Sequence, residues 1–227
     1  MTVIWDCVDT RRFFPAPTLE DTLAKYGIPD PATGINLLSL GRMTKDSAHK
    51  GYERLLEVFA RVASKLPKLR LVFGGRGDMI ASLRERAAAL HLADRVHFLG
   101  SIDESDLANV YRTAHIFSLV SDRGHGRGEG IPLTPLEAAA CGVPLLVGNH
   151  DGSQEAVVEG DNGFICDPFD LSAHADRITR LVSDTELRGR MARRAHQRIT
   201  EHFTFERFTS EHAALYEQLQ NGVAVAH

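Results

Sequence analysis

Long apolar segments, clustered cysteines and an excess of positive charge are all missing from this sequence of 227 residues. No apolar run approaches the roughly 20 residues that a membrane-spanning helix needs. The three cysteines, Cys7, Cys141 and Cys166, are scattered and odd in number, which favours reduced thiols over a disulfide framework or a zinc site. A formal net charge of −4 argues against the basic surface that nucleic-acid binding requires, so no nucleic-acid partner is expected.

The first residues, Met1 to Asp6, contain neither the basic nor the apolar region of a signal peptide, so we expect a cytoplasmic protein. Hydrophobic residues make up 43% of the chain, and a chain of this length can bury a core as one domain. Residues 1–18 contain Pro15 and Pro17 and are predicted to form a linker or edge segment. Residues 19–227 are assigned to a single domain, opening with a helix from Thr18 in which Asp21 would complete a capping box.

Short apolar runs alternate with segments of helical periodicity over most of the chain. The runs predict six strands, at residues 35–40, 69–73, 95–99, 114–119, 143–147 and 163–166. Strands that alternate with helices of about 10 to 15 residues form βαβ units. We therefore expect an α/β fold, with a doubly wound, Rossmann-like parallel sheet and three extra C-terminal helices on its outside, at residues 171–182, 184–202 and 205–219.

Charged or glycine-rich loops follow the predicted strands. The loop after the first strand contains Gly41, Arg42, Lys45 and Lys50, and residues 74–78 after the second strand include three glycines. Ligands of doubly wound sheets bind beyond the carboxyl ends of the strands, and arginine and lysine there suit a diphosphate. Solvated loop charges are the alternative interpretation. The glycines do not match the G-x-G-x-x-G fingerprint, because Ile80 occupies the third glycine position, so no nicotinamide cofactor is expected.

Two carboxylates, Glu129 and Glu137, stand eight positions apart, the first beside glycine and proline and the second in a predicted helix. Carboxylates accept hydrogen bonds from hydroxyl groups, and a helix N-terminus attracts phosphate. The pair therefore indicates a site for a polyol joined to phosphate. The alternative is a loop glutamate followed by a first-turn glutamate that the helix dipole favours.

The motifs, in this order, resemble the C-terminal, nucleotide-sugar-binding domain of GT-B glycosyltransferases, specifically the retaining family 4 with its glycosyl transferases group 1 domain. The resemblance covers nearly the whole chain, and the residues that carry it are 8–13, 41–42, 50–51, 98–100, 129–137, 141–144, 152–155 and 163–168. Two departures stand out. Family members often carry Asn-Gly where this chain has Asp6-Cys7, and the longer loop leaves open whether Lys45 or Lys50 contacts phosphate.

The resemblance implies a role for each matching residue. The catalytic set would be Glu129, Arg42 and Lys50. The donor-binding set would be Gly41, Ser101, Ile102, Gly130, Ile131, Pro132 and Glu137. Glu129 would hold the donor sugar, Glu137 the ribose, and the backbone at Ser101 and Ile102 the nucleobase. The two cations would stabilise the leaving diphosphate.

The implied activity is retaining hexosyl transfer from a nucleoside diphosphate sugar to a glycan or lipid-linked acceptor, as in polysaccharide biosynthesis, with no metal or other cofactor. GT-B enzymes also have an N-terminal acceptor domain, which this sequence does not contain, so the chain is expected to be inactive as an isolated domain. The alternatives are a binding module without turnover and a GT-B sugar epimerase. Arginines between Arg188 and Arg198 indicate either a solvated face or peripheral contact with the inner membrane face.

Overall fold

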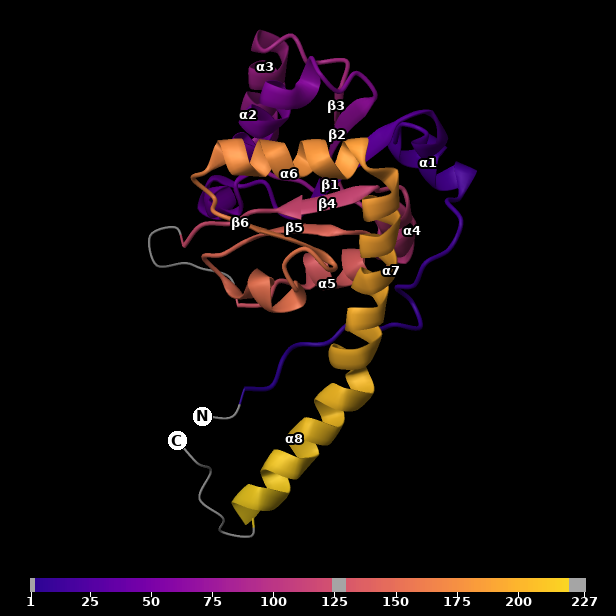
Figure 1. Cartoon of the computed structure of the whole chain (residues 1–227), viewed down its shortest axis with the longest axis vertical. Coiled ribbons are helices and arrows are strands. Elements are labelled where there is room, and N and C mark those ends of the chain that lie inside the picture. The colour runs from indigo at the N-terminus through magenta and orange to yellow at the C-terminus, as the bar shows by residue number, and fades with distance from the viewer. Residues whose placement is uncertain (1–2, 124–129, 221–227) are drawn as a thin grey trace.

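The computed structural model describes residues 3–123 and 130–220. These ranges contain one six-stranded parallel sheet, flanked by helices on both faces (Figure 1). The strand order is β3-β2-β1-β4-β5-β6. The strands are β1 Ile35–Leu40, β2 Leu69–Gly74, β3 Val96–Phe98, β4 Ile116–Leu119, β5 Leu145–Gly148 and β6 Gly163–Cys166. All six predicted strands are confirmed, because a run of apolar residues buried on both faces is the pattern of a covered parallel sheet.

The helices divide into two layers that cover opposite faces of the sheet. They are α1 Glu20–Tyr26, α2 Tyr52–Ala63, α3 Ile80–Ala89, α4 Leu107–Arg112, α5 Leu133–Ala140, α6 Leu171–Ser183, α7 Thr185–His202 and α8 Phe205–Gln220. Buried side chains of α2, α3 and α6 share one core cluster, and those of α4 and α5 share a second cluster with the end of α7. The doubly wound fold class is therefore confirmed.

One predicted local feature is wrong. The Thr18 hydroxyl does not cap α1; it donates to the carbonyl of Arg112 at 3.1 Å, and the N-cap is Leu19, without a side-chain hydrogen bond. The difference arises where residues 8–18 run along α4, a tertiary contact that competes with local capping.

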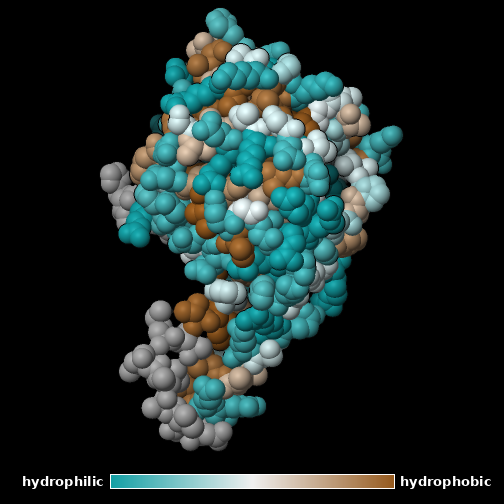
Figure 2. Space-filling view, in the orientation of Figure 1, coloured by the Kyte–Doolittle hydropathy of each residue, from teal (hydrophilic) through white to brown (hydrophobic). Residues whose placement is uncertain are grey.

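The C-terminal helices pack unequally. α6 contacts α2 and α7 contacts α5, whereas α8 contains no buried residue and projects from the body of the domain (Figure 1). Three large apolar side chains of α8 are exposed, Phe205 by 54%, Tyr216 by 62% and Leu219 by 55%. Apolar surface is visible on this projecting part in Figure 2. The N-terminal segment follows the junction of α7 and α8, where the Trp5 ring stacks on Phe203 with 5.1 Å between centroids.

The loops that leave β1 and β2 are joined by their backbones. Gly41 donates to the carbonyl of Gly74 at 3.0 Å, and Met43 donates to the carbonyl of Arg76 at 3.0 Å. Gly75 has a φ of +122°, and a Cβ atom there would stand 2.0 Å from the Gly41 carbonyl oxygen. Only glycine permits this approach, because the contact excludes a side chain and the backbone conformation disfavours one.

We expect Gly75→Ala to lower the free energy of unfolding by about 2–4 kcal/mol, through backbone strain and a steric clash together. Gly27→Ala is the matched control, because Gly27 has a φ of +61° but a Cβ atom there would have no other atom within 4 Å. The control isolates the strain and should cost only about 1–2 kcal/mol. Urea unfolding curves measure both, and equal losses would contradict the interlocked loops.

Candidate functional site

A pocket of about 240 Å³ opens at the carboxyl ends of β1, β2 and β3. Four of the residues predicted from the sequence line it together: Gly41, Arg42, Ser101 and Ile102. They meet because parallel strands place the loops that follow them at one edge of the sheet. The remaining lining residues are Leu40, Gly75, Arg76 and Leu107. The structure therefore joins three loops that are about 30 residues apart in the chain into one concave site.

Two arginines, Arg42 and Arg76, line the pocket, and no carboxylate is among its described lining residues. Lys50 also lies here, since its Nζ atom would be 3.9 Å from a Cβ atom built on Gly41. Lys50 is half-buried at the end of the 3-10 turn Lys45–Lys50, whereas Lys45 is exposed at its start. Of the two lysines left open by the sequence, Lys50 is thus the one placed beside the pocket. Three cations at one mouth favour an anionic ligand.

Glu137 lies on the second turn of α5 and is fixed by a hydrogen bond from α4. The Tyr111 hydroxyl donates to its Oε2 atom at 2.7 Å. Burial raises the pKa of the Glu137 carboxyl, while the Tyr111 hydrogen bond acts in the opposite direction. Burial, followed by the nearby Glu137 charge, raises the pKa of Tyr111 well above its ordinary value, so this hydroxyl keeps its proton and donates.

The other predicted residues of the motif lie at the start of α5. Pro132 is the N-cap of α5 and is buried, and Ile131 packs against the core cluster beneath it. Gly130 lies against the 3-10 turn Gly152–Ala156, because a Cβ atom on Gly152 would be 2.4 Å from the Gly130 carbonyl oxygen. These three residues do not line the 240 Å³ pocket. Glu129 lies outside the described residues.

Sequence reasoning missed Arg76 and Tyr111. Arg76 belongs to the glycine-rich loop after β2, and its charge at the end of a strand is the signal that could have found it. Tyr111 has no comparable signal. In the sequence it is simply one residue on the apolar face of a helix. Only the packing of α4 on α5 places its hydroxyl against Glu137.

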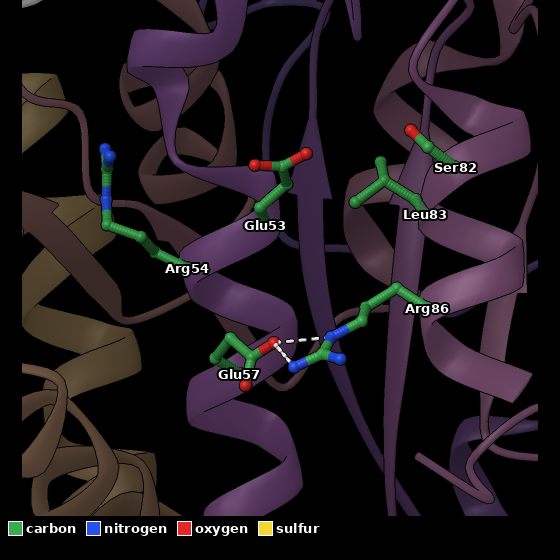
Figure 3. Close-up of a pocket in the computed structure, with 6 residues that line it drawn as sticks. All are labelled: Glu53, Arg54, Glu57, Ser82, Leu83 and Arg86. Atoms are coloured by element: carbon green, nitrogen blue, oxygen red, sulfur yellow. Dashed lines mark hydrogen bonds and ion pairs between the residues drawn. The ribbon is translucent and has the colours of Figure 1, made fainter. Parts of the chain in front are cut away.

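A larger groove of about 440 Å³ lies between α2 and α3, away from these residues (Figure 3). An ion pair joins its two walls, with the Arg86 Nε atom 2.8 Å from Glu57 Oε1. Arg54 points away from α3 and pairs with Asp122 Oδ2 at 2.6 Å. Because Arg86 and Glu57 pair across the groove and Arg54 pairs with Asp122, we assign the groove no ligand.

The arginines of α7 are largely engaged within the domain. Arg188 donates to the carbonyls of Leu181 and Val182 at the end of α6, Arg194 pairs with Asp161, and Arg198 donates to the Glu155 carbonyl. Arg190 and Arg193 are exposed. Membrane contact by this face stays a prediction. Fewer arginines are available for contact with lipid headgroups than the sequence alone implied.

Within residues 3–123 and 130–220, no helix has the length and apolar character to cross a membrane. The same ranges contain no group of three or more His, Cys, Asp or Glu side chains that could hold a metal ion.

Similarity to known proteins agrees with this geometry. Mannosylfructose-phosphate synthase of Agrobacterium fabrum is 30% identical over 219 residues, covering 92% of this chain and 46% of that protein. A GDP-mannose-dependent monoacylated α-(1-6)-phosphatidylinositol monomannoside mannosyltransferase of Corynebacterium glutamicum is 32% identical, covering 83% of this chain and 49% of that protein. The chain therefore spans about half the length of the curated relatives it matches.

Solved structures share the fold. Sucrose-phosphate synthase of Thermosynechococcus elongatus has a TM-score of 0.79 at 26% identity, over 96% of this chain and 52% of that one. Anabaena HepE in complex with UDP has a TM-score of 0.82 over 96% of this chain and 57% of that one, but its 21% identity shows the fold alone. The family model described as glycosyl transferases group 1 matches residues 28–198. The chain belongs to this family of glycosyltransferases.

Proposed function

We propose that this chain is the donor-binding half of a retaining glycosyltransferase that transfers a hexosyl group from a nucleoside diphosphate sugar to a glycan or lipid-linked acceptor. The observation that carries the proposal is the convergence of Gly41, Arg42, Ser101 and Ile102 on one pocket, with Lys50 at its mouth. The GDP-mannose-dependent relatives support a nucleotide sugar as donor. The base, the sugar and the acceptor are not specified by these residues.

In the proposed arrangement the parts of the donor lie along the edge of the sheet. The nucleobase occupies the pocket beside Ser101 and Ile102, and the ribose hydroxyls reach Glu137. The diphosphate lies between Arg42, Lys50 and the N-terminus of α5, where Gly130, Ile131 and Pro132 bring backbone close to it. Glu129 holds the sugar. The protein contacts thus follow the order of the parts within the donor: base, ribose, diphosphate and sugar.

The proposed chemistry depends on charge stabilisation. As the bond between the anomeric carbon and the phosphate oxygen breaks, negative charge grows on the diphosphate, and the proposed role of Arg42 and Lys50 is to stabilise that charge. Guanidinium and ammonium groups fixed beforehand need no reorganisation during the reaction. This role for cations does not require a metal. Glu137 serves binding, not attack, because Tyr111 and the ribose occupy its two oxygens.

The acceptor side of the reaction is proposed to come from outside these residues. All six described strands belong to one sheet, and that sheet is used to build the donor pocket. Relatives about twice as long as the chain leave room for a second domain. Positioning of the acceptor and exclusion of water would then require that domain.

We expect the chain to bind at least one of UDP, GDP and ADP in calorimetry. Arg42→Ala and Lys50→Ala should each weaken that binding by about 1.5–3 kcal/mol, the range for hydrogen bonds to charged groups. Lys45→Ala is the matched control, because Lys45 is an exposed lysine on the same turn. Binding of none of the three nucleotides to the folded protein would refute the proposal. Equal losses for Lys45 and Lys50 would refute the assigned phosphate contact.

We also expect the chain alone to transfer no sugar to an acceptor, because the described residues form one sheet, which the donor pocket uses, and no second sheet that could position the acceptor. A radiolabelled-donor assay measures transfer with the purified chain, alone and mixed with a separately expressed N-terminal domain from a relative. Hydrolysis of the donor should be slow at most. Robust acceptor-dependent transfer by the chain alone would overturn the half-enzyme proposal, whereas donor binding without transfer in any mixture would favour a binding module.

A further inference from the structure

The Tyr111 side chain is held in one orientation from two sides. It is fully buried, and its ring makes edge contacts with Phe13 of the N-terminal segment and Phe117 of β4, at centroid distances of 6.0 and 5.9 Å. Aromatic rings packed in this way keep their direction because surrounding side chains fill the space on every side. The hydroxyl at the end of this fixed ring donates to Glu137 Oε2 at 2.7 Å.

The second oxygen of Glu137 is left for another partner. Within the described part of the chain, Oε1 receives no hydrogen bond, and it is not among the buried side-chain atoms that lack a partner. A carboxylate has two oxygens and accepts on both. Tyr111 therefore uses one oxygen and leaves the other accessible to a ligand.

Glu137 is connected to the pocket wall through Tyr111 and helix α4. Tyr111 is one helical turn after Leu107 on α4, and Leu107 lines the pocket. The charges that act on Glu137 come from the same region. They are Glu104, which follows the Ser101 and Ile102 wall, and Arg12, which donates to both the carboxylate and the carbonyl of Glu104.

We propose that Tyr111 is a positioning residue for ribose recognition: its buried hydroxyl fixes the Glu137 carboxylate so that the free oxygen meets the ribose diol of the nucleotide. This inference rests on the proposed function, since it assigns how the same site recognises its donor. Tyr111 itself does not touch the nucleotide. Its effect reaches the ligand through Glu137 only.

To recognise a diol, a half-buried carboxylate needs both a fixed direction and a stabilised negative charge. Burial raises the pKa of Glu137, and the Tyr111 hydrogen bond is the main influence that lowers it. Among the groups that face the carboxylate, Glu104 raises its pKa and Arg12 lowers it. Burial raises the pKa of the neighbouring Cys141 thiol to about 12, so that group stays neutral. Without the tyrosine hydroxyl, the Glu137 pKa moves further upward and the carboxylate loses its anchor.

The test compares each of UDP, GDP and ADP with its 2′-deoxy form by calorimetry between about pH 5 and pH 8. The ratio of the two affinities isolates recognition of the 2′-hydroxyl, because base and diphosphate, including the titration of the phosphate, are common to both ligands. Tyr111→Phe keeps the ring and removes only the hydroxyl. We expect it to reduce the ribose preference by about five- to thirtyfold, which is about 1–2 kcal/mol, because the Glu137 carboxylate remains but is no longer held in one direction.

The pH dependence has a defined sign. The ionised carboxylate recognises the diol. The ribose preference is therefore present at pH values above the Glu137 pKa of the folded protein, and it is lost as the pH falls through that pKa. Because Tyr111→Phe raises that pKa, the acid loss of preference should move to higher pH in the variant. A merely structural role for Tyr111 would not move this profile.

Two further variants serve as controls. Tyr26→Phe removes another hydroxyl that donates to a carboxylate, Asp106 Oδ2 at 2.8 Å, and should leave the ribose preference unchanged. In a Glu137→Ala background, Tyr111→Phe should have no further effect on the preference, because no carboxylate remains to be positioned. Folding of each variant is checked by its urea midpoint.

The outcomes separate the two proposals. If wild-type protein binds none of the nucleotides, the proposed function fails. If it binds them with a ribose preference, and Tyr111→Phe keeps both that preference and its pH profile, the function stands and the role of Tyr111 is overturned. If Tyr111→Phe reduces the ribose preference by the same factor with and without Glu137, the positioning role of Tyr111 is also overturned. Loss of preference only when Glu137 is present supports it.

Discussion

The pairing of β1 with strands on both sides is the constraint on which the site depends. Leu37 of β1 is in register with Leu71 of β2 on one side and with Ile116 of β4 on the other. The chain winds outward from β1 to β3, then returns across the sheet to β4 and winds the other way. The strand order therefore reverses between β1 and β4, which is the kind of point at which doubly wound sheets bind their ligands. The described pocket lies beside that point, at the carboxyl ends of β1, β2 and β3.

The site is electrically asymmetric along the edge of the sheet. Arg42, Arg76 and Lys50 gather where the β1 and β2 loops end, whereas Glu137 lies deeper, between α4 and α5. The two parts of a nucleotide bind to different groups. A diphosphate binds to cations, whereas ribose hydroxyls donate to hydrogen-bond acceptors. Among the described residues, Glu137 accepts a hydrogen bond from Tyr111 and forms no ion pair with these cations.

The sequence predicted the sheet well because its strands are buried on both faces and read as continuous apolar runs. It also placed Gly41, Arg42, Ser101 and Ile102 in one site, since the rule about carboxyl ends of strands needs only the strand positions. It failed at Thr18, whose hydroxyl takes a partner more than 90 residues away. It could not find Tyr111 for the same reason: the bond to Glu137 spans 26 residues and depends on how two helices pack. Local patterns cannot report a partner that only the tertiary structure supplies.

The contact between Gly75 and the Gly41 carbonyl has a consequence for how this site can change. Two of the three loops that form the pocket are fastened through their main chains, at Gly41 with Gly74 and at Met43 with Arg76. Displacing either loop at these positions would break its hydrogen bonds to the other. Among the pocket residues, the side chains at positions 42, 76, 102 and 107 can therefore change without disturbing this backbone frame.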